Sequence, residues 1–176
     1  TGKINKSYST SVTTANILLG NVNTLKPTST LSISAWVYRG SDAANYPYII
    51  TCENFSSSYG YRFGDSSSGL NNVFSVRING TSGHAYNCPE TSVTLNSWVH
   101  YVVIFDNKYI KLYKNGVLNN SKTHTSTTIN YDATSIYSYG SIVGYVDQMA
   151  VWNRALSTTE ISQLYNSGNG LAYSSW

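Results

Sequence analysis

Apolar and polar residues alternate along most of this chain, which is the pattern of strands with one buried face. Segment 31–37 shows it most clearly, because every second residue is apolar and the residues between are Ser32, Ser34 and Trp36. Segment 98–105 is the longest apolar run and is rich in β-branched and aromatic residues, which predicts a central strand. Further strands are predicted at 48–53, 59–64, 73–78, 84–87, 109–114, 117–122, 136–139 and 146–152.

Two Asn-Gly pairs mark tight turns between these strands. Asn115–Gly116 separates 109–114 from 117–122 and is a strong type I′ hairpin signal, because both central residues of that turn need positive φ. Asn79–Gly80 predicts a second tight turn after strand 73–78.

A single short helix is predicted near the end of the chain. Ser157 and Glu160 have the spacing of a capping box, in which each side chain can bond the backbone amide of the other residue. Leu156 and Ile161 stand where a hydrophobic staple needs its two apolar residues, and Gly168 is placed to end the helix.

The predicted strand 146–152 contains one acidic residue, Asp147, whose side chain could face either the core or the solvent. Strand periodicity places Asp147 on the same face as Met149 and Val151, so Asp147 is expected to point inward. Trp152 lies on the opposite face, and the pattern alone does not assign it to the core or to the surface.

Short strands with Gly- and Asn-containing turns, followed by one helix, predict an all-β fold. We expect an antiparallel β-sandwich with one short C-terminal helix, formed as a single domain over residues 1–176.

Three stretches of the chain follow a shared family pattern in the right order. They are 31–37 (LSISAWV), 98–106 with 111–116 (WVHYVVIFD and KLYKNG), and 144–165, which contains Asn-Arg-Ala-Leu-Ser. Together they resemble the laminin-G-like, concanavalin A-like jelly rolls over about residues 17–165. The resemblance implies that fold, which lectins and some glucanases share, and it places Trp36, Trp98 and His100 at framework positions.

The same resemblance raises the question of calcium. Many members of the family hold one Ca²⁺ at the rim of the sandwich, and the Asp that matches Asp147 often contributes. Calcium takes about six to eight oxygen ligands, and Asp42 is the candidate second acid here. A buried carboxylate needs some partner, and Arg154 or loop amides are the alternatives to the metal.

Composition narrows the function classes. Charged residues make up 11% of the chain and the net charge is +3, with no basic run, so we expect no nucleic-acid partner. No apolar stretch has the length of a membrane span, so we expect no membrane insertion. The sequence lacks an N-terminal signal core, and its Asn-, Ser-, Thr- and Tyr-rich composition suits an extracellular or virion-surface module excised from a larger protein.

Catalysis is not expected. The eight acidic residues are scattered, and none form the Glu-x-Asp-x-Glu strand that glucanases of this fold use to align carboxylates on one face. His84, His100 and His124 lie on separate segments without metal-ligand spacing. A glycoside hydrolase is therefore the third hypothesis for this chain.

Tyrosine supplies the candidate binding residues. Sugars are held by aromatic faces together with a few placed polar groups, and the chain has 16 tyrosines. Three clusters combine tyrosine with suitable neighbours: Tyr59, Tyr61 and Arg62; Tyr86 and Asn87; Tyr137 and Tyr139. Tyr59 and Tyr61 are two residues apart on a predicted strand and should share one face.

Two cysteines, Cys52 and Cys88, follow strand-like runs, and both a disulfide and two free thiols are compatible with that placement.

We therefore predict a non-catalytic recognition module for a glycan or cell-surface polysaccharide, carried by a larger assembly. The alternative is a structural decoration or assembly domain of a virion or surface fibre. A recognition site should show exposed aromatic rings in a concavity, whereas an assembly domain should show a flat apolar patch.

Overall fold

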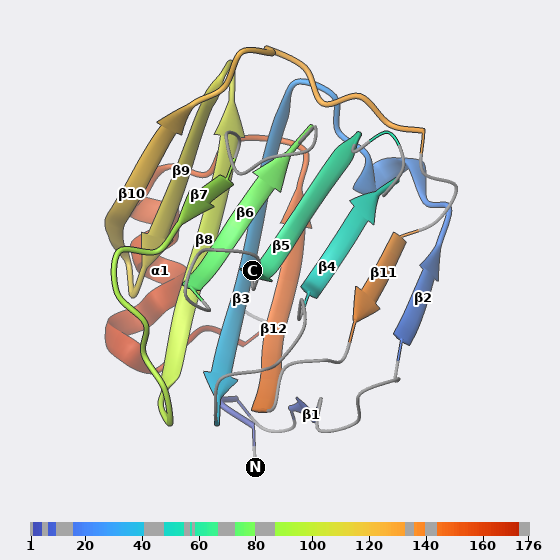
Figure 1. The fold of residues 1–176 in the computed structure, drawn as a ribbon. Coiled ribbons are helices and arrows are strands. Elements are labelled where there is room, and N and C mark those ends of the chain that lie inside the picture. Colours follow the sequence, from blue (N-terminus) through green and yellow to red (C-terminus); the bar gives the residue numbers. More distant parts are fainter. Residues whose placement is uncertain are drawn as a thin grey trace.

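Two antiparallel sheets lie face to face in the computed structural model, which describes residues 2–4, 7–9, 16–40, 48–54, 57, 59–66, 73–79, 87–132, 136–139 and 144–172. Figure 1 shows the two layers, with α1 on the far side of the rear sheet. The rear sheet, sheet A, has the order β1-β12-β3-β8-β9-β10, and the front sheet, sheet B, has the order β2-β11-β4-β5-β6-β7. This architecture confirms the predicted all-β sandwich with one short helix.

The elements follow one another along the chain as β1 (Tyr8–Ser9), β2 (Asn16–Gly20), η1 (Asn23–Leu25), β3 (Thr30–Arg39), β4 (Tyr48–Glu53), β5 (Gly60–Ser66), β6 (Val73–Ile78), β7 (Asn87–Pro89), β8 (Trp98–Asp106), β9 (Tyr109–Lys114), β10 (Val117–Thr123), β11 (Ile136–Tyr139), β12 (Gly144–Trp152), α1 (Thr158–Tyr165) and η3 (Asn166–Gly168). Strands 48–53, 73–78, 109–114 and 136–139 have the predicted bounds. Of the strand predicted at 84–87, only residue 87 lies within the described part of the chain.

The main core lies between the sheets. Alternating residues of β3 point into it and are almost fully buried: Leu31, Ile33, Ala35 and Val37. A second, smaller core lies between the outer face of sheet A and α1, where Ile161 and Leu164 of the helix pack with Val102 and Ile104 of β8. Sheet A is therefore covered on both faces along α1, which explains the continuous apolar run from Tyr101 to Phe105 in β8.

The capping box and the hairpin turn form as predicted. Ser157 Oγ accepts a hydrogen bond from the amide of Glu160, and the Glu160 carboxylate accepts one from the amide of Ser157 at 2.8 Å. Asn115 and Gly116 both have positive φ, 51° and 79°, as a type I′ turn requires. The prediction that Gly168 ends the helix is wrong. The helix α1 ends at Tyr165, and Asn166 is its C-cap in the left-handed conformation.

One extra residue in β12 reverses the predicted facing of Asp147. Gln148 has φ of 50°, and the register with β3 slips by one residue between Asp147 and Ala150. A bulge of this kind places two residues opposite one. Asp147 therefore pairs with Trp36 on the outer face of sheet A, while Met149 and Val151 pack against the inner core.

The two cysteines do not form a disulfide. Both are buried and free, Cys52 in β4 and Cys88 in β7. Strands β5 and β6 lie between β4 and β7, so three strand spacings of about 4.8 Å each separate the strands that carry the two cysteines. A disulfide needs Cα atoms within about 7 Å.

Candidate functional site

Three of the predicted binding residues occupy one row across sheet B. The register pairs Tyr137 of β11 with Thr51, Thr51 with Arg62, Arg62 with Arg77 of β6, and Arg77 with Asn87 of β7. Residues paired in this way share a face of the sheet. The fold thus brings Tyr137, Arg62 and Asn87 into line from three separate segments.

The centre of this row is a buried ion cluster. Arg77 Nη2 lies 2.7 Å from Glu53 Oε1, and Arg62 Nη1 lies 3.5 Å from Glu53 Oε2. Arg62 also donates to the hydroxyl of Tyr48 at 2.8 Å, with its guanidinium 4.4 Å above the centre of that ring. Burial raises the pKa of Glu53, and the two arginines oppose that shift. The Arg62 guanidinium therefore contacts Glu53 and Tyr48 of β4 and links β5 to that strand.

Tyr61 is a core residue, which corrects its prediction as a binding platform. Its ring is 0% exposed and packs edge-to-face on Tyr131, and its hydroxyl donates to the carbonyl of Leu25 at 3.0 Å. Tyr59 precedes β5 and is 42% exposed, so the two rings do not share a face. The backbone turns between them at Gly60, whose φ of 114° is outside strand geometry.

The structure describes the other predicted binding residues only in part. Tyr137 is half-buried, whereas Tyr86 lies outside the described residues. Asn87 and Tyr139 are placed in their strands, but their side chains lie outside the described part. Binding roles for Tyr59, Tyr137, Tyr139, Tyr86 and Asn87 stay predictions.

Asp147 is held by backbone amides. Its Oδ2 accepts from the amide of Ile4 at 2.8 Å, and its Oδ1 accepts from the amide of Gln148 at 2.8 Å. Arg154, the other protein partner considered for it, pairs instead with Glu160. Among the described residues no group of three or more His, Cys, Asp or Glu side chains could hold a metal ion. Asp42, the second acid considered for calcium, lies outside the described residues, so a calcium site at Asp147 stays a prediction.

His100 is buried in the second core. Its Nε2 lies 2.8 Å from Ser34 Oγ, and its ring contacts those of Trp36 and Tyr165, which also stack on each other, at centroid distances of 5.0 and 6.2 Å. Burial lowers its pKa to about 4. Its contacts are those of a packing residue, as the sequence predicts.

An aromatic trio occupies the outer face of sheet A beyond the helix. Tyr38 packs on Trp98 and on Tyr145 at centroid distances of 5.8 Å each. Tyr145 is 38% exposed, and Tyr38 and Trp98 are half-buried. Trp98, which the family resemblance places at a framework position, lies on the outer face of sheet A. It pairs with Tyr38, whose strand turns its odd-numbered residues inward.

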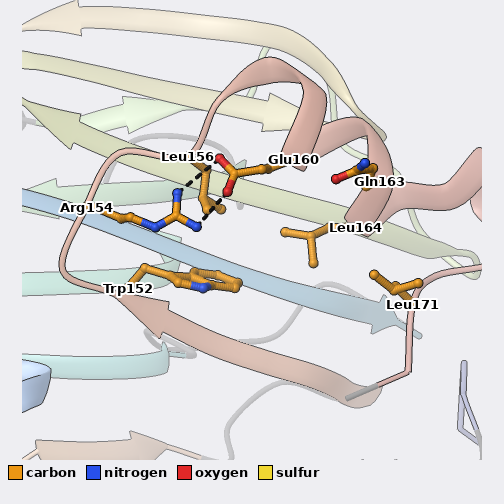
Figure 2. A pocket seen from close by; sticks show the side chains of 7 residues that line it. All are labelled: Trp152, Arg154, Leu156, Glu160, Gln163, Leu164 and Leu171. Carbon is orange, nitrogen blue, oxygen red and sulfur yellow. Dashed lines mark hydrogen bonds and ion pairs between the residues drawn. The ribbon is translucent and has the colours of Figure 1, made fainter. Parts of the chain in front are cut away.

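A pocket of about 250 Å³ lies between α1 and the end of β12. Figure 2 shows its lining, with the indole of Trp152 on one side and the helix on the other. The side chains around it are Trp152, Arg154, Leu156, Glu160, Gln163, Leu164 and Leu171.

The corner that connects β12 to α1 sets the geometry of this pocket. Ser32 Oγ donates to the carbonyl of Arg154 at 2.7 Å and accepts from the amide of Leu156 at 3.1 Å. The capping box then fixes Glu160 in the first turn of the helix. The pocket is therefore built on two regular elements, and the corner between them is held to β3 by the Ser32 hydroxyl.

A bidentate ion pair forms the polar side of the pocket. Arg154 Nη2 donates to Glu160 Oε1 at 2.6 Å, and Nη1 donates to Oε2 at 3.0 Å. These bonds, with those from Ser157, lower the pKa of Glu160 to about 2, so the carboxylate is ionised at neutral pH. The pocket thus combines one aromatic face, several leucines and a small group of fixed polar atoms, which is the chemistry of an amphipathic ligand site.

Sequence reasoning did not place this pocket. Trp152 was left unassigned, and Gln163 and Leu171 carried no signal. The capping box was recognised, and an arginine six residues before its glutamate was the available clue to the ion pair.

Comparison with known proteins identifies the family. The profile described as the concanavalin A-like lectin/glucanases superfamily matches residues 9–162. No curated protein matches the sequence. Among the described residues no helix has the length and apolarity to cross a membrane.

Several solved structures share the fold at low sequence identity. Domain 4 of AbnA, an extracellular arabinanase from Geobacillus stearothermophilus solved with arabinotriose, is 18% identical with a TM-score of 0.66, over 92% of this chain and 77% of that one. The CBM40 of the Ruminococcus gnavus IT-sialidase, bound to α2,3-sialyllactose, is 15% identical with a TM-score of 0.66, over 89% and 95%. The binding domain of Paraclostridial Mosquitocidal Protein 1 is 19% identical with a TM-score of 0.69 over 95% of this chain, which spans only 44% of that domain.

Proposed function

Because the chain belongs to the concanavalin A-like lectin/glucanases superfamily, we propose that it is a non-catalytic carbohydrate-binding domain whose site is the pocket beside Trp152. The observation that carries this proposal is the pairing of the half-buried Trp152 ring with the fixed polar groups of Arg154 and Glu160. Sugars present apolar C–H surfaces and hydroxyl groups together, and this lining offers a partner for each.

The described carboxylates support binding over hydrolysis. Glycoside hydrolysis needs two carboxyl groups that face each other across a gap of about 5–9.5 Å. Glu53 and Glu90 are buried and paired with cations, and Asp147 accepts amide hydrogen bonds. Glu160 is held by Arg154 and by its own helix cap.

Two of the similar structures were solved with a bound glycan, which supports a carbohydrate-binding role. The arabinanase domain was solved with arabinotriose and the CBM40 with sialyllactose. We infer that the present chain serves as the glycan-binding part of a larger secreted or surface protein.

A glycan array tests the proposal. We expect the domain to bind a defined subset of glycans, and Trp152→Ala to reduce that binding at least tenfold, because the main stacking face is lost. Tyr109→Ser is the matched control, since Tyr109 is 55% exposed on β9 and does not line the pocket. Loss of binding with Tyr59→Ala in place of Trp152→Ala would move the site to the start of β5. Loss of binding with chelator would support a calcium-dependent site, and no binding at all would overturn the proposal.

An assembly role is the second candidate, favoured by the aromatic trio of Tyr38, Trp98 and Tyr145. Three rings in contact on an open sheet face form an apolar patch suited to a protein partner. If that role holds, the domain should self-associate or bind its parent protein, and Tyr145→Ser should weaken this in sedimentation experiments.

A further inference from the structure

The Trp152 pocket has room for a sugar ring. Its volume of about 250 Å³ is many times the roughly 10–15 Å³ of such space that one water molecule needs. A single sugar ring with its hydroxyl groups therefore fits among the described residues that line it. Leu164 and Leu171 border the pocket at the end away from Arg154 (Figure 2), so a ring that enters is met by side chains on several sides.

The distribution of polar atoms gives the ring an orientation. Figure 2 places Trp152 on the β12 side of the pocket, with Gln163 and Leu164 on the helix opposite it. Arg154, Leu156 and Glu160 lie along the corner and the first turn of the helix. A ring that lies with its C–H surface on the indole therefore directs hydroxyl groups toward the ion pair and the Gln163 amide.

The charge of the lining is balanced. Arg154 is the one cation among the lining residues and Glu160 is the one anion, and two hydrogen bonds of 2.6 and 3.0 Å join them. Glu160 also accepts from the amide and the hydroxyl of Ser157, at 2.8 and 2.9 Å. A ligand carboxylate would have to compete with a glutamate that is held by four hydrogen bonds, and it would be repelled by that glutamate at short range.

We propose that the pocket receives a single neutral sugar ring at the end of a glycan and discriminates against rings that carry a carboxylate, an inference that rests on the proposed function. The neighbour bound to sialyllactose holds an acidic glycan, so the proposal separates this chain from that structure by ligand charge. The ion pair sets this selectivity, because both Nη atoms of Arg154 already donate to Glu160 and the charge of that glutamate repels a ligand carboxylate.

Calorimetry with a matched set of glycans tests this inference. The probes are neutral oligosaccharides of one to four units, and the same oligosaccharides capped at the free end with sialic acid. We expect the neutral-ended probes to bind, the capped probes to bind at least tenfold more weakly, and chain extension beyond two units to change the affinity less than threefold. Equal or stronger binding of capped probes, or affinity that rises steadily with length, would overturn the proposal.

Glu160→Gln provides the decisive variant. Glutamine retains the capping-box geometry, so α1 is expected to persist, while Arg154 loses its counter-charge. This variant should bind capped probes at least fivefold more tightly than the wild type does, and Arg154→Gln should show no such gain. An unchanged preference in Glu160→Gln would refute the role of the ion pair. If no probe binds the wild type and the array is also silent, the proposed function itself fails. If probes bind but Trp152→Ala is neutral, this inference and the placement of the site at the Trp152 pocket both fall, while carbohydrate binding itself stands.

Discussion

The Nε2 atom of His100 lies 2.8 Å from the hydroxyl of Ser34, on the outer face of sheet A beneath the helix. The imidazole is 1% exposed, and its Nδ1 has no hydrogen-bond partner in the part of the chain that the structure describes. A charged imidazolium would therefore be poorly solvated at this position.

This burial predicts that the domain loses stability in mild acid. The pKa of His100 falls from 6.5 to about 4 on folding. Between these values the unfolded chain binds a proton that the folded protein does not, so the free energy of unfolding decreases as pH falls from about 6.5 to 4. The full loss is about 3 kcal/mol. Urea unfolding should give a lower free energy of unfolding at pH 5 than at pH 7. The variant His100→Gln should flatten this pH dependence. An unchanged slope in that variant would assign the effect to other groups.

Substitution of Asp147 should destabilise the fold independently of calcium. Asp147→Asn replaces one of two acceptor oxygens by an amide donor, which then faces the backbone amide of Ile4 or of Gln148. We expect a loss of about 1–3 kcal/mol in the free energy of unfolding. Thermal unfolding of the wild type with and without chelator is the control. A melting temperature that drops with chelator in the wild type alone would show a metal at this carboxylate.

The cysteines should behave as buried thiols. Burial raises the pKa of Cys52 and of Cys88 to about 11, which keeps the reactive thiolate scarce. Both thiols should react with a thiol reagent in denaturant and only slowly in the folded protein, and a reducing agent should leave the melting temperature unchanged. Stabilisation that is lost on reduction would contradict the free-thiol assignment.

Gly60 should not tolerate a side chain. Its φ is 114°, and a Cβ built there would lie 1.7 Å from the carbonyl oxygen of Cys52. Gly60→Ala should cost about 2–4 kcal/mol, because the backbone of β4 or β5 must shift. Gly20→Ala is the matched control, since Gly20 also has positive φ but no atom within 4 Å of that Cβ. Comparable melting temperatures for the two variants would rule out the clash.

Local signals in the sequence determined the parts of the fold that depend on neighbouring residues. The capping box of Ser157 and Glu160, the turn at Asn115–Gly116 and the alternation along β3 each involve atoms within a few residues of one another. Their geometry follows from backbone chemistry, so the strand positions and the helix start could be predicted.

Only the tertiary structure decided which side chains are available at the surface. Tyr61 became core and Trp98 became half-exposed because each depends on what packs against its strand. The bulge at Gln148 places Asp147 on the face opposite to Met149, since a shift of one residue reverses strand parity.

The pocket shows the same division. Its glutamate was recognised as a helix cap, but its tryptophan ends a strand that only sheet pairing places beside that helix. Burial and site formation depend on contacts between segments far apart in sequence, such as Ser32 with Arg154. The sequence by itself therefore determined the elements of this protein, and the packing of those elements decided where a ligand can enter.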